Sequence, residues 1–253
     1  MRRWFLFLAI GTLLCAIVLV TFPARVALKL LPESALPVQM EGVGGTLWSG
    51  HANRVLRDGR DLGQLQWRLR PLPLLRGRID TDLILAGPEL QGSGRIIAGG
   101  DGNLRVEGGK ARFPAARLER LLDVPALTLA GSVEVSLAAL ELRNRVPVAL
   151  QGEAVWNDAG VSGAEQAVFG TLRAEFAALP GGGFGGRVSD QGDGPLAVDG
   201  KFSTSLLGFE ARATLRARDG NPQVQSALRH IGQMQPDGSV VYELRGGLME
   251  KGA

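Results

Sequence analysis

The chain has few of the residues on which enzyme active sites depend. Its 253 residues include one cysteine, one tyrosine and two histidines. The cysteine, Cys15, lies inside an apolar run, which excludes disulfides and cysteine-based zinc sites. No G-x-S-x-G nucleophile elbow accompanies His51 or His230, so we expect surface or turn positions for both. A Ser-His-Asp arrangement through either histidine stays open as the less favoured alternative.

Excess charge of one sign is also scarce outside the N-terminus. The chain has 28 basic and 25 acidic residues and a pI near 9.5. Four basic residues and no acid fall in residues 1–31, which leaves 24 basic against 25 acidic residues in the remainder. Binding to a nucleic-acid backbone needs a concentrated positive field, so we expect no nucleic-acid partner.

Signatures of phosphate, carboxylate and metal chemistry are weak. The glycine-rich stretches GVGG and GGGFGG lack a following Lys-Ser/Thr pair, so they predict turns and not a phosphate loop. Asp80 and Asp82 share one face of a predicted strand, as a glycosidase carboxylate or a metal ligand would, but a hydrated strand face explains them equally. We therefore predict a protein that is not an enzyme, with no catalytic residues, no metal site and no cofactor.

What the sequence does have is an uncharged run at residues 4–22, directly behind Arg2 and Arg3. A helix of this length is about long enough to cross a hydrocarbon core of roughly 30 Å. Because basic flanks stay on the cytoplasmic side, we predict cytoplasmic residues 1–3, a transmembrane anchor at 4–22, and the rest of the chain in the bacterial periplasm. A cleavable signal peptide is less favoured, because the run exceeds the usual apolar length of about 7–15 residues and no clean small-x-small site follows.

Residues 23–36 predict an amphipathic segment at the membrane interface. Arg25 and Lys29 would reach toward lipid headgroups. The expected apolar face consists of Val26, Ala27, Leu30 and Leu31.

Residues 37–253 predict a periplasmic, β-rich domain. The chain has 36 glycines and 13 prolines, typical of strands joined by tight turns. Leu65, Trp67 and Leu69 alternate with polar residues, and the same period of two recurs from Phe209 to Ala217. The fold class indicated is all-β and mainly antiparallel. If the apolar face of such a sheet is left uncovered, it would form a trough for acyl chains or for a partner's apolar segment.

Three segments interrupt the alternating pattern of the predicted strands. Two of them are predicted helices, and the third is a predicted loop or linker. A short helix is predicted from Pro114, and another from Asn221 as N-cap, with Pro222 in its first turn and Gly232 at its end. Residues 179–195 contain six glycines between Gly181 and Gly192 and predict either a mobile loop or a linker.

Arginines are concentrated between Arg54 and Arg78, where seven of them face only Asp58 and Asp61. Such a cluster is either a surface for anionic lipid headgroups or an acidic partner, or a solvated strand face, and we favour the second interpretation. The residues that would form the lipid or partner surface are Arg68, Arg70, Arg76 and Arg78.

Several short motifs of the sequence, in this order, resemble those of the N component of the bacterial type II secretion system. They are FPARVALKLLP after the apolar run, GTLWSG at 45–50, LGQLQWRLRPLPLLRG at 62–77, VALQGEAVWNDAG at 148–160 and the closing LRHIGQMQPDGSVVYELRGGL. Together they span nearly the whole chain. The signature positions that carry over as structural ones are Gly45, Thr46, Leu47, Trp48, Ser49 and Gly50.

The resemblance implies a bitopic inner-membrane protein with a periplasmic β-rich body that serves the secretion machine as an accessory. Its implied partners are the secretin or the inner-membrane platform proteins, and it implies no catalytic residues. The family is also similar to AsmA-like proteins, which implies a curled or U-shaped sheet. The alternative function is therefore a lipid-binding or lipid-transfer module that holds phospholipid in an apolar groove. The direct partner, the exported substrates and the oligomeric state do not follow from the sequence.

Overall fold

The computed structural model describes residues 20–30, 38–119, 127–144, 146–180, 182–205 and 208–247. The chain divides into two compact units, Met1–Ile97 and Ala98–Ala253. The prediction of a mainly antiparallel β protein is confirmed, since helices in the described ranges are few and short. Residues 4–19 of the predicted anchor lie outside the described residues. Within the described ranges, no helix combines the length and the apolar character needed to span a bilayer.

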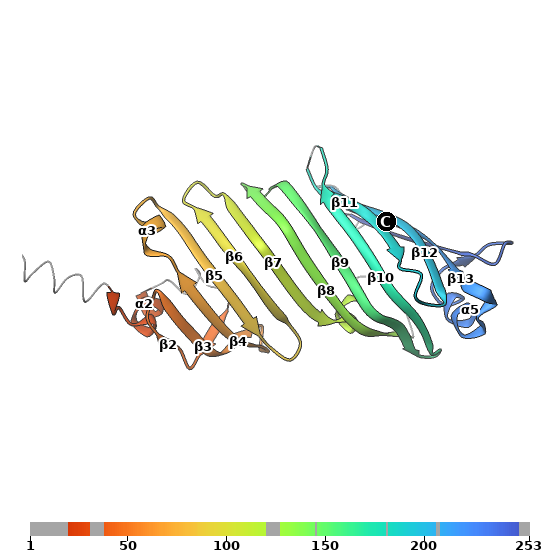
Figure 1. Cartoon of the computed structure of the whole chain (residues 1–253), viewed down its shortest axis with the longest axis horizontal. Helices are drawn as coiled ribbons and strands as arrows, with labels where there is room; N and C mark the ends of the chain where they lie inside the picture. The colour runs from red at the N-terminus through yellow and green to blue at the C-terminus, as the bar shows by residue number, and fades with distance from the viewer. Residues whose placement is uncertain are drawn as a thin grey trace, which may run out of the picture. The chain divides into compact units, whose positions relative to one another are not determined.

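The first unit is an antiparallel sheet with one helix packed on it (Figure 1). Strand β3 pairs with β1, β2 and β4, and β4 pairs with β5. The elements are α2 (Ala24–Leu30), β1 (Gln39–Glu41), β2 (Gly44–Gly45), β3 (Ser49–Arg57), β4 (Arg60–Leu69), α3 (Pro71–Leu74), β5 (Arg78–Ala86) and β6 (Gln91–Gly99), the last crossing into the second unit.

Helix α2 packs on this sheet through Ala24 and Leu28, which are not among the residues predicted to face the membrane. Ala24 is fully buried against Ala52 and Val55, whereas Val26 is exposed. Arg25 is exposed, and its Nε donates a hydrogen bond to the carbonyl oxygen of Val43. The contact of Arg25 with lipid headgroups stays a prediction.

The second unit is a meander in which β7 to β13 pair in chain order, followed by β15 and β14. Such short connections between neighbouring strands are the common arrangement. The elements are β7 (Leu104–Pro114), η2 (Ala115–Leu118), β8 (Leu127–Arg143), β9 (Val146–Gly163), β10 (Ala167–Ala178), β11 (Phe184–Asp190), β12 (Leu196–Ser205), β13 (Gly208–Ala217), η3 (Arg218–Gly220), α5 (Pro222–Leu228), β14 (Gln233–Met234) and β15 (Val240–Gly247).

The prediction of a loop or linker over residues 179–195 is wrong in its middle, where strand β11 pairs with β10 on one side and β12 on the other. The Asp190 carboxylate fixes the end of this strand by accepting hydrogen bonds from the backbone N–H of Gly192 and of Val198, both at 2.8 Å. It also forms an ion pair with Arg218. Burial raises the pKa of Asp190, but these hydrogen bonds outweigh it and hold the pKa below the usual value.

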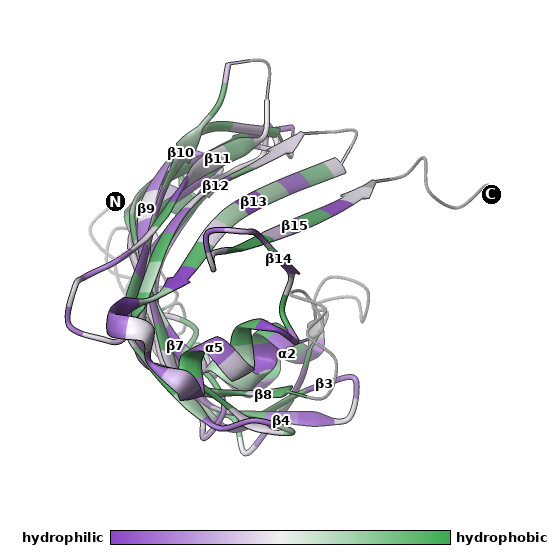
Figure 2. Ribbon diagram, turned by 90° about the vertical axis from the view of Figure 1, so that its right-hand side faces the viewer, coloured by the Kyte–Doolittle hydropathy of each residue, from purple (hydrophilic) through white to green (hydrophobic). Residues whose placement is uncertain are grey.

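Helix α5 closes one part of the inner face of this sheet. It begins as predicted, with the Asn221 side chain accepting hydrogen bonds from the backbone N–H of Gln223 and Val224. It ends at Leu228, before the predicted stop at Gly232. Val224 and Leu228 are buried in the core with Val240, and Figure 2 shows α5 on the inner side of the curve that β9 to β13 follow.

In the described part of the helix predicted from Pro114, residues 115–118 form the 3-10 turn η2, whose Ala115 joins this core, and Glu119 is α-helical. Residues 120–124 of that prediction lie outside the described residues. Trp156 packs against the same cluster, and its indole Nε1 donates a hydrogen bond to the carbonyl oxygen of Ala130 at 2.8 Å.

Candidate functional site

The residues at which the predicted anchor ends are joined directly to the sheet of the first unit. The backbone N–H of Leu47 donates a hydrogen bond to the carbonyl oxygen of Phe22 at 2.9 Å, and Pro23 forms an antiparallel bridge with Thr46. Helix α2 begins at the next residue, the buried Ala24. No flexible linker separates residue 22 from the sheet. We call Phe22, Pro23 and the turn at residues 45–50 the anchor clamp.

The GTLWSG sequence forms the turn half of this clamp. The backbone N–H of Thr46 donates to the carbonyl oxygen of Ser49 at 2.9 Å, and the N–H of Ser49 donates back to the Thr46 hydroxyl at 3.2 Å. Gly45 has a φ of +81°, a conformation that glycine adopts without steric cost. The carbonyl oxygen of Trp48 accepts from the N–H of Leu69 at 2.7 Å, which ties the turn to the end of β4.

Trp67 holds the clamp from the core side. Its indole Nε1 donates a hydrogen bond to the carbonyl oxygen of Leu47 at 3.1 Å. The ring lies over Gly50, where an added Cβ would stand 2.4 Å from Trp67 Cζ2. Trp67 also packs against the buried cluster of the first unit, on the apolar side of the alternating pattern of β4. Leu47 is therefore bonded through its N–H to Phe22 and through its carbonyl to Trp67.

The four arginines of the predicted basic surface do not share one environment. Arg70 contacts two carboxylates, Asp80 at 2.6 Å and Asp82 at 2.9 Å, and Arg95 also contacts Asp80 at 2.6 Å. Arg68, Arg76 and Arg78 are exposed. Arg70 therefore differs from the other three, because it is ion-paired with two carboxylates, and the role of these arginines as a contact surface stays a prediction.

Asp80 is the centre of that ion-pair cluster and is only 6% exposed. The hydrogen bond from Arg95 outweighs the effect of burial and, together with Arg70, lowers the pKa of Asp80 to about 2. Asp80 and Asp82 are thus counterions of arginines. This arrangement gives the two carboxylates a structural role in place of the catalytic or metal-ligand role that the sequence left open. In the described part of the chain, no three or more His, Cys, Asp or Glu side chains gather as metal ligands would.

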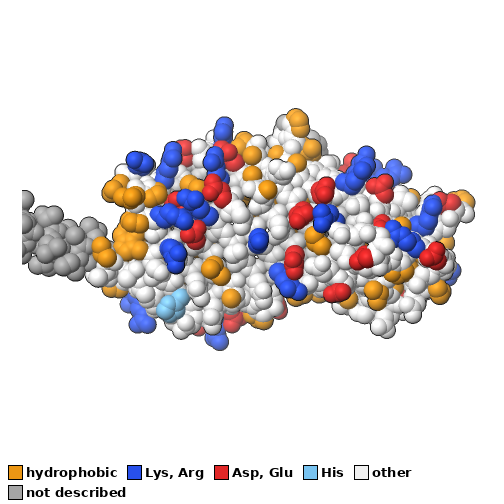
Figure 3. Space-filling view, in the orientation of Figure 1, with side chains coloured by type: hydrophobic (Ala, Val, Ile, Leu, Met, Phe, Trp, Pro, Cys, Tyr) orange, Lys and Arg blue, Asp and Glu red, His pale blue; other side chains and the backbone are white. Residues whose placement is uncertain are grey.

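Between β4 and β5 the chain forms a short apolar and basic turn, which we call the Leu–Arg turn, residues 71–78. Leu72 is 75% exposed and Leu75 is 84% exposed. Figure 3 shows hydrophobic side chains gathered next to basic ones at the position of α3. The turn is ordered by hydrogen bonds from the N–H of Arg76 to the Pro73 carbonyl at 3.0 Å and from Gly77 to Leu74 at 2.9 Å.

In the second unit, phenylalanines on neighbouring strands line the part of the inner face that α5 does not cover. Phe176, Phe184 and Phe202 follow one another on β10, β11 and β12, with adjacent ring centroids 6.4 Å apart. Phe209 on β13 continues this face, because it pairs with Thr204, two residues from Phe202 on β12. All four rings are partly or largely accessible to solvent.

Three of these rings lie over glycines of the adjacent strand. Register places Phe176 opposite Gly152, Phe202 opposite Gly186, and Phe209 opposite Gly246. An added Cβ at these glycines would stand 2.8, 2.9 and 2.4 Å from the facing ring. Aromatic rings that cover glycines protect the bare backbone from water and leave the face smooth and apolar.

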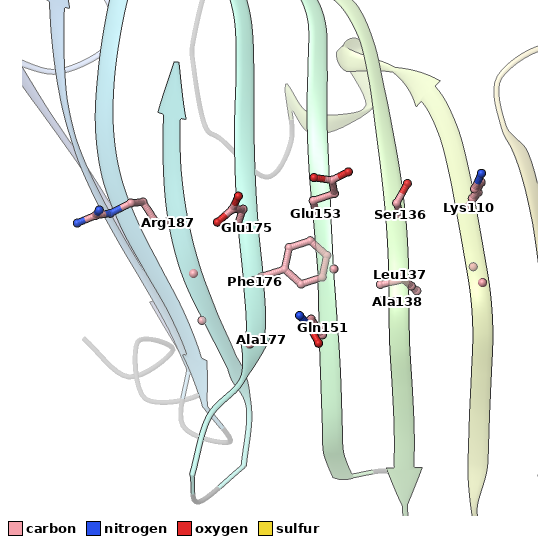
Figure 4. A pocket seen from close by; sticks show the side chains of 15 residues that line it. Lys110, Ser136, Leu137, Ala138, Gln151, Glu153, Glu175, Phe176, Ala177 and Arg187 are labelled. Carbon is pink, nitrogen blue, oxygen red and sulfur yellow. The ribbon is translucent and has the colours of Figure 1, made fainter. Parts of the chain in front are cut away.

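The opposite, outer face of the same strands is polar. Register aligns Lys110, Ser136, Glu153, Glu175 and Arg187 in one row across β7 to β11 (Figure 4). The next outward positions are small, among them Gly108, Ala138 and Gly185, which leaves a shallow depression of about 790 Å³. Its lining includes no histidine or cysteine.

Comparison with known proteins identifies the family. The family model described as "Type II secretion system (T2SS), protein N" matches residues 37–245. The chain belongs to the type II secretion system protein N family. Type II secretion system protein N of Vibrio cholerae serotype O1 is 28% identical over 208 residues, covering 77% of this chain and 81% of the relative. The Aeromonas hydrophila protein of the same name is 34% identical over 125 residues, covering 47% and 48%. No solved structure matches the chain significantly.

The two histidines of this protein N family member are the last candidate catalytic residues to be placed. His51 and His230 are both exposed, as predicted. The His51 ring lies against Gly44, and His230 Nε2 stands 3.7 Å from a Glu165 carboxylate oxygen. His51 lies in the first unit, next to Gly50 of the anchor clamp, and His230 lies in the second unit.

Sequence reasoning missed two features of this protein N family member. The exposed leucines of the Leu–Arg turn were signalled by PLPLLRGR, where apolar residues interrupt a basic segment without an acid. The phenylalanine–glycine pairs had no local signal, because each pair joins residues on different strands.

Proposed function

We propose that the protein is a non-enzymatic component of the type II secretion machinery, anchored in the inner membrane by residues 4–22. Its periplasmic sheet contacts other components of the machinery, for which the secretin and the inner-membrane platform proteins are the candidates. Membership of the protein N family supports the assignment to this machinery. The anchored arrangement is supported by the sequence of residues 1–22 and by the anchor clamp.

The clamp is the observation that carries this proposal. A protein that only needed to be tethered could follow its anchor with a flexible linker. Here the carbonyl oxygen of Phe22 accepts a backbone hydrogen bond from Leu47, and Ala24 is already in the core. The first unit would therefore stand at a fixed height and orientation over the bilayer, as a contact surface for membrane-bound partners requires.

The first experiment tests the membrane topology. Protease added to spheroplasts should degrade the chain beyond residue 22, and the same protease should spare it in intact cells. Protection of the C-terminal part in spheroplasts would place it in the cytoplasm and contradict the proposal.

The second experiment tests the fixed height. We insert a Gly-Ser linker of about ten residues between Phe22 and Pro23, which leaves the anchor and the sheet intact but separates them. Secretion of type II substrates into the medium should fall severalfold while the protein remains membrane-bound and at normal abundance. The matched control places the same insertion at Asp58–Gly59, an open hairpin turn where a Cβ added at Gly59 would meet nothing within 4 Å. Equal secretion by both variants would contradict presentation at a fixed height.

A second candidate function is phospholipid binding by the inner face of the second unit. The row of accessible phenylalanines, with rings lying over glycines, favours it, because that face is apolar over four neighbouring strands. Native mass spectrometry of the full chain should then show bound phospholipid after detergent removal. Phe202→Glu should abolish it, whereas Lys201→Glu, on the outer side of the same strand, should not. A lipid-free spectrum of the wild-type protein would contradict this function.

A further inference from the structure

We propose that the Leu–Arg turn is a second membrane contact, which inserts Leu72 and Leu75 into an anionic bilayer surface beside the anchor. This inference depends on the proposed anchoring but not on any secretion partner. It concerns a surface of the first unit only. Three observations carry it: exposure, charge and position.

Exposure is the first observation. Leu72 and Leu75 are among the most exposed large hydrophobic side chains in the described residues, and Ile79 nearby is half exposed. Exposed apolar side chains grouped in this way mark contact surfaces. Because hydrogen bonds from Arg76 and Gly77 to the backbone of Pro73 and Leu74 already order the turn, insertion would cost little conformational entropy.

Charge is the second observation. Residues 62–79 contain four arginines and no acid, and Arg70 is occupied by Asp80 and Asp82. Arg68 precedes the leucines in the sequence, Arg76 and Arg78 follow them, and all three arginines are exposed. Exposed leucines between exposed arginines match a bilayer surface, where apolar side chains enter the acyl boundary and guanidinium groups meet anionic headgroups. An acidic protein partner would satisfy the arginines but would leave both leucines without an equivalent apolar phase.

Position is the third observation. The N–H of Leu69, the last residue of β4, donates to the carbonyl oxygen of Trp48, and the adjacent Leu47 donates to Phe22. The Leu–Arg turn starts two residues after Leu69, so it lies at the same end of the sheet as the residue where the predicted anchor ends. Figure 1 shows α2 and α3 at this common end of the first unit. An anchor that leaves the bilayer at Phe22 would therefore bring the turn to the headgroup region.

The test uses the full chain in lipid nanodiscs. Cys15 is the only cysteine, so Cys15→Ser allows single labelling at Leu75→Cys with an environment-sensitive fluorophore. The nanodiscs contain phosphatidylglycerol and a lipid whose nitroxide spin label lies near the headgroup. This spin label should quench the fluorophore at residue 75. The matched control is Val168→Cys in the second unit, where Val168 is 65% exposed, and its label should stay unquenched.

Charge dependence then identifies the lipid headgroup as the ligand. Arg76→Gln and Arg78→Gln should each lower the equilibrium constant for insertion of the turn about fivefold. Nanodiscs of phosphatidylcholine alone should weaken the quenching of the label at residue 75 in the same way. Circular dichroism checks that the variants are folded. If the chain enters nanodiscs but the label at 75 is no more quenched than the label at 168, the inference is wrong while the anchor stands, and the leucines belong to a protein contact. If the chain does not enter nanodiscs, both the anchor and this inference are wrong.

Discussion

The indole Nε1 of Trp67 donates a hydrogen bond across 3.1 Å to the carbonyl oxygen of Leu47, whose own N–H is bonded to Phe22. A core side chain on β4 is therefore connected through Leu47 alone to Phe22, the residue at which the predicted anchor ends. The GTLWSG turn therefore connects the predicted anchor to the sheet. The connection to β4 depends on the indole Nε1 of Trp67.

Trp67→Phe tests that connection. The substitution keeps a ring over Gly50 but removes the donor to Leu47, so we expect the free energy of unfolding to fall by about 1 kcal/mol. Secretion should fall as well, because the anchor is then less firmly coupled to the sheet. The measurements are thermal unfolding and secreted substrate in the medium.

Trp156→Phe is the matched control for this prediction. Trp156 also donates its indole hydrogen bond to a backbone carbonyl, that of Ala130 in the second unit. It should show a similar loss of stability without the loss of secretion. Equal secretion defects in the two variants would assign the effect to stability and not to the clamp.

The ion-pair cluster around Asp80 predicts an acid-sensitive stability. Its pKa is about 2 in the folded protein and about 3.9 in the unfolded chain. A carboxyl whose pKa is lowered on folding stabilises the protein above pH 4, and this contribution of about 2 kcal/mol is lost as the pH falls from about 4 to 2. Urea unfolding of the wild-type protein across this range should show the decrease.

Asp80→Asn should remove that part of the pH dependence and lower stability at neutral pH, because Arg70 and Arg95 lose their shared counterion. Asp61→Asn is the control, since Asp61 pairs with Arg54 at an exposed position, where ion pairs contribute little. An Asp80→Asn variant with an unchanged acid transition would show that the cluster does not govern it.

Gly186→Ala tests the packing of phenylalanine on glycine. An added Cβ would stand 1.9 Å from the carbonyl oxygen of Glu175 and 2.9 Å from the Phe202 ring. We expect a loss of about 1–3 kcal/mol, because backbone and ring must both shift. Gly192→Asn is the control, since Gly192 has a φ of +78°, an added Cβ there would meet nothing within 4 Å, and asparagine tolerates this conformation. Equal stability of the two variants in chemical denaturation would refute the packing argument.

Asn221→Ala tests the helix that closes the inner face. It removes the acceptor for the backbone N–H of Gln223 and Val224, so the free energy of unfolding should fall by about 1 kcal/mol. Asn221→Asp retains the acceptor and should preserve most of the stability. Thermal unfolding compares the two, and an alanine variant as stable as the aspartate variant would exclude a capping role.

The sequence by itself determined the features that depend on neighbouring residues. Alternation at Leu65 and Trp67 marks a strand with one apolar face, because side chains of a strand point to opposite sides at a period of two. Asn221 followed by Pro222 marks the start of a helix, because the cap acts on backbone groups two and three residues away. The order of short motifs, including GTLWSG, was enough to indicate the family.

Only the tertiary structure decided which residues meet across strands. Arg70 looked like part of a basic surface until register brought Asp80 beside it, and Arg95 completed the cluster from β6. In the same way β11 formed within a glycine-rich segment because β10 and β12 offered it partners on both sides. Backbone pairing and burial depend on strands brought together by folding, so neither the neutralised arginine nor the rings over glycines could be found from local pattern.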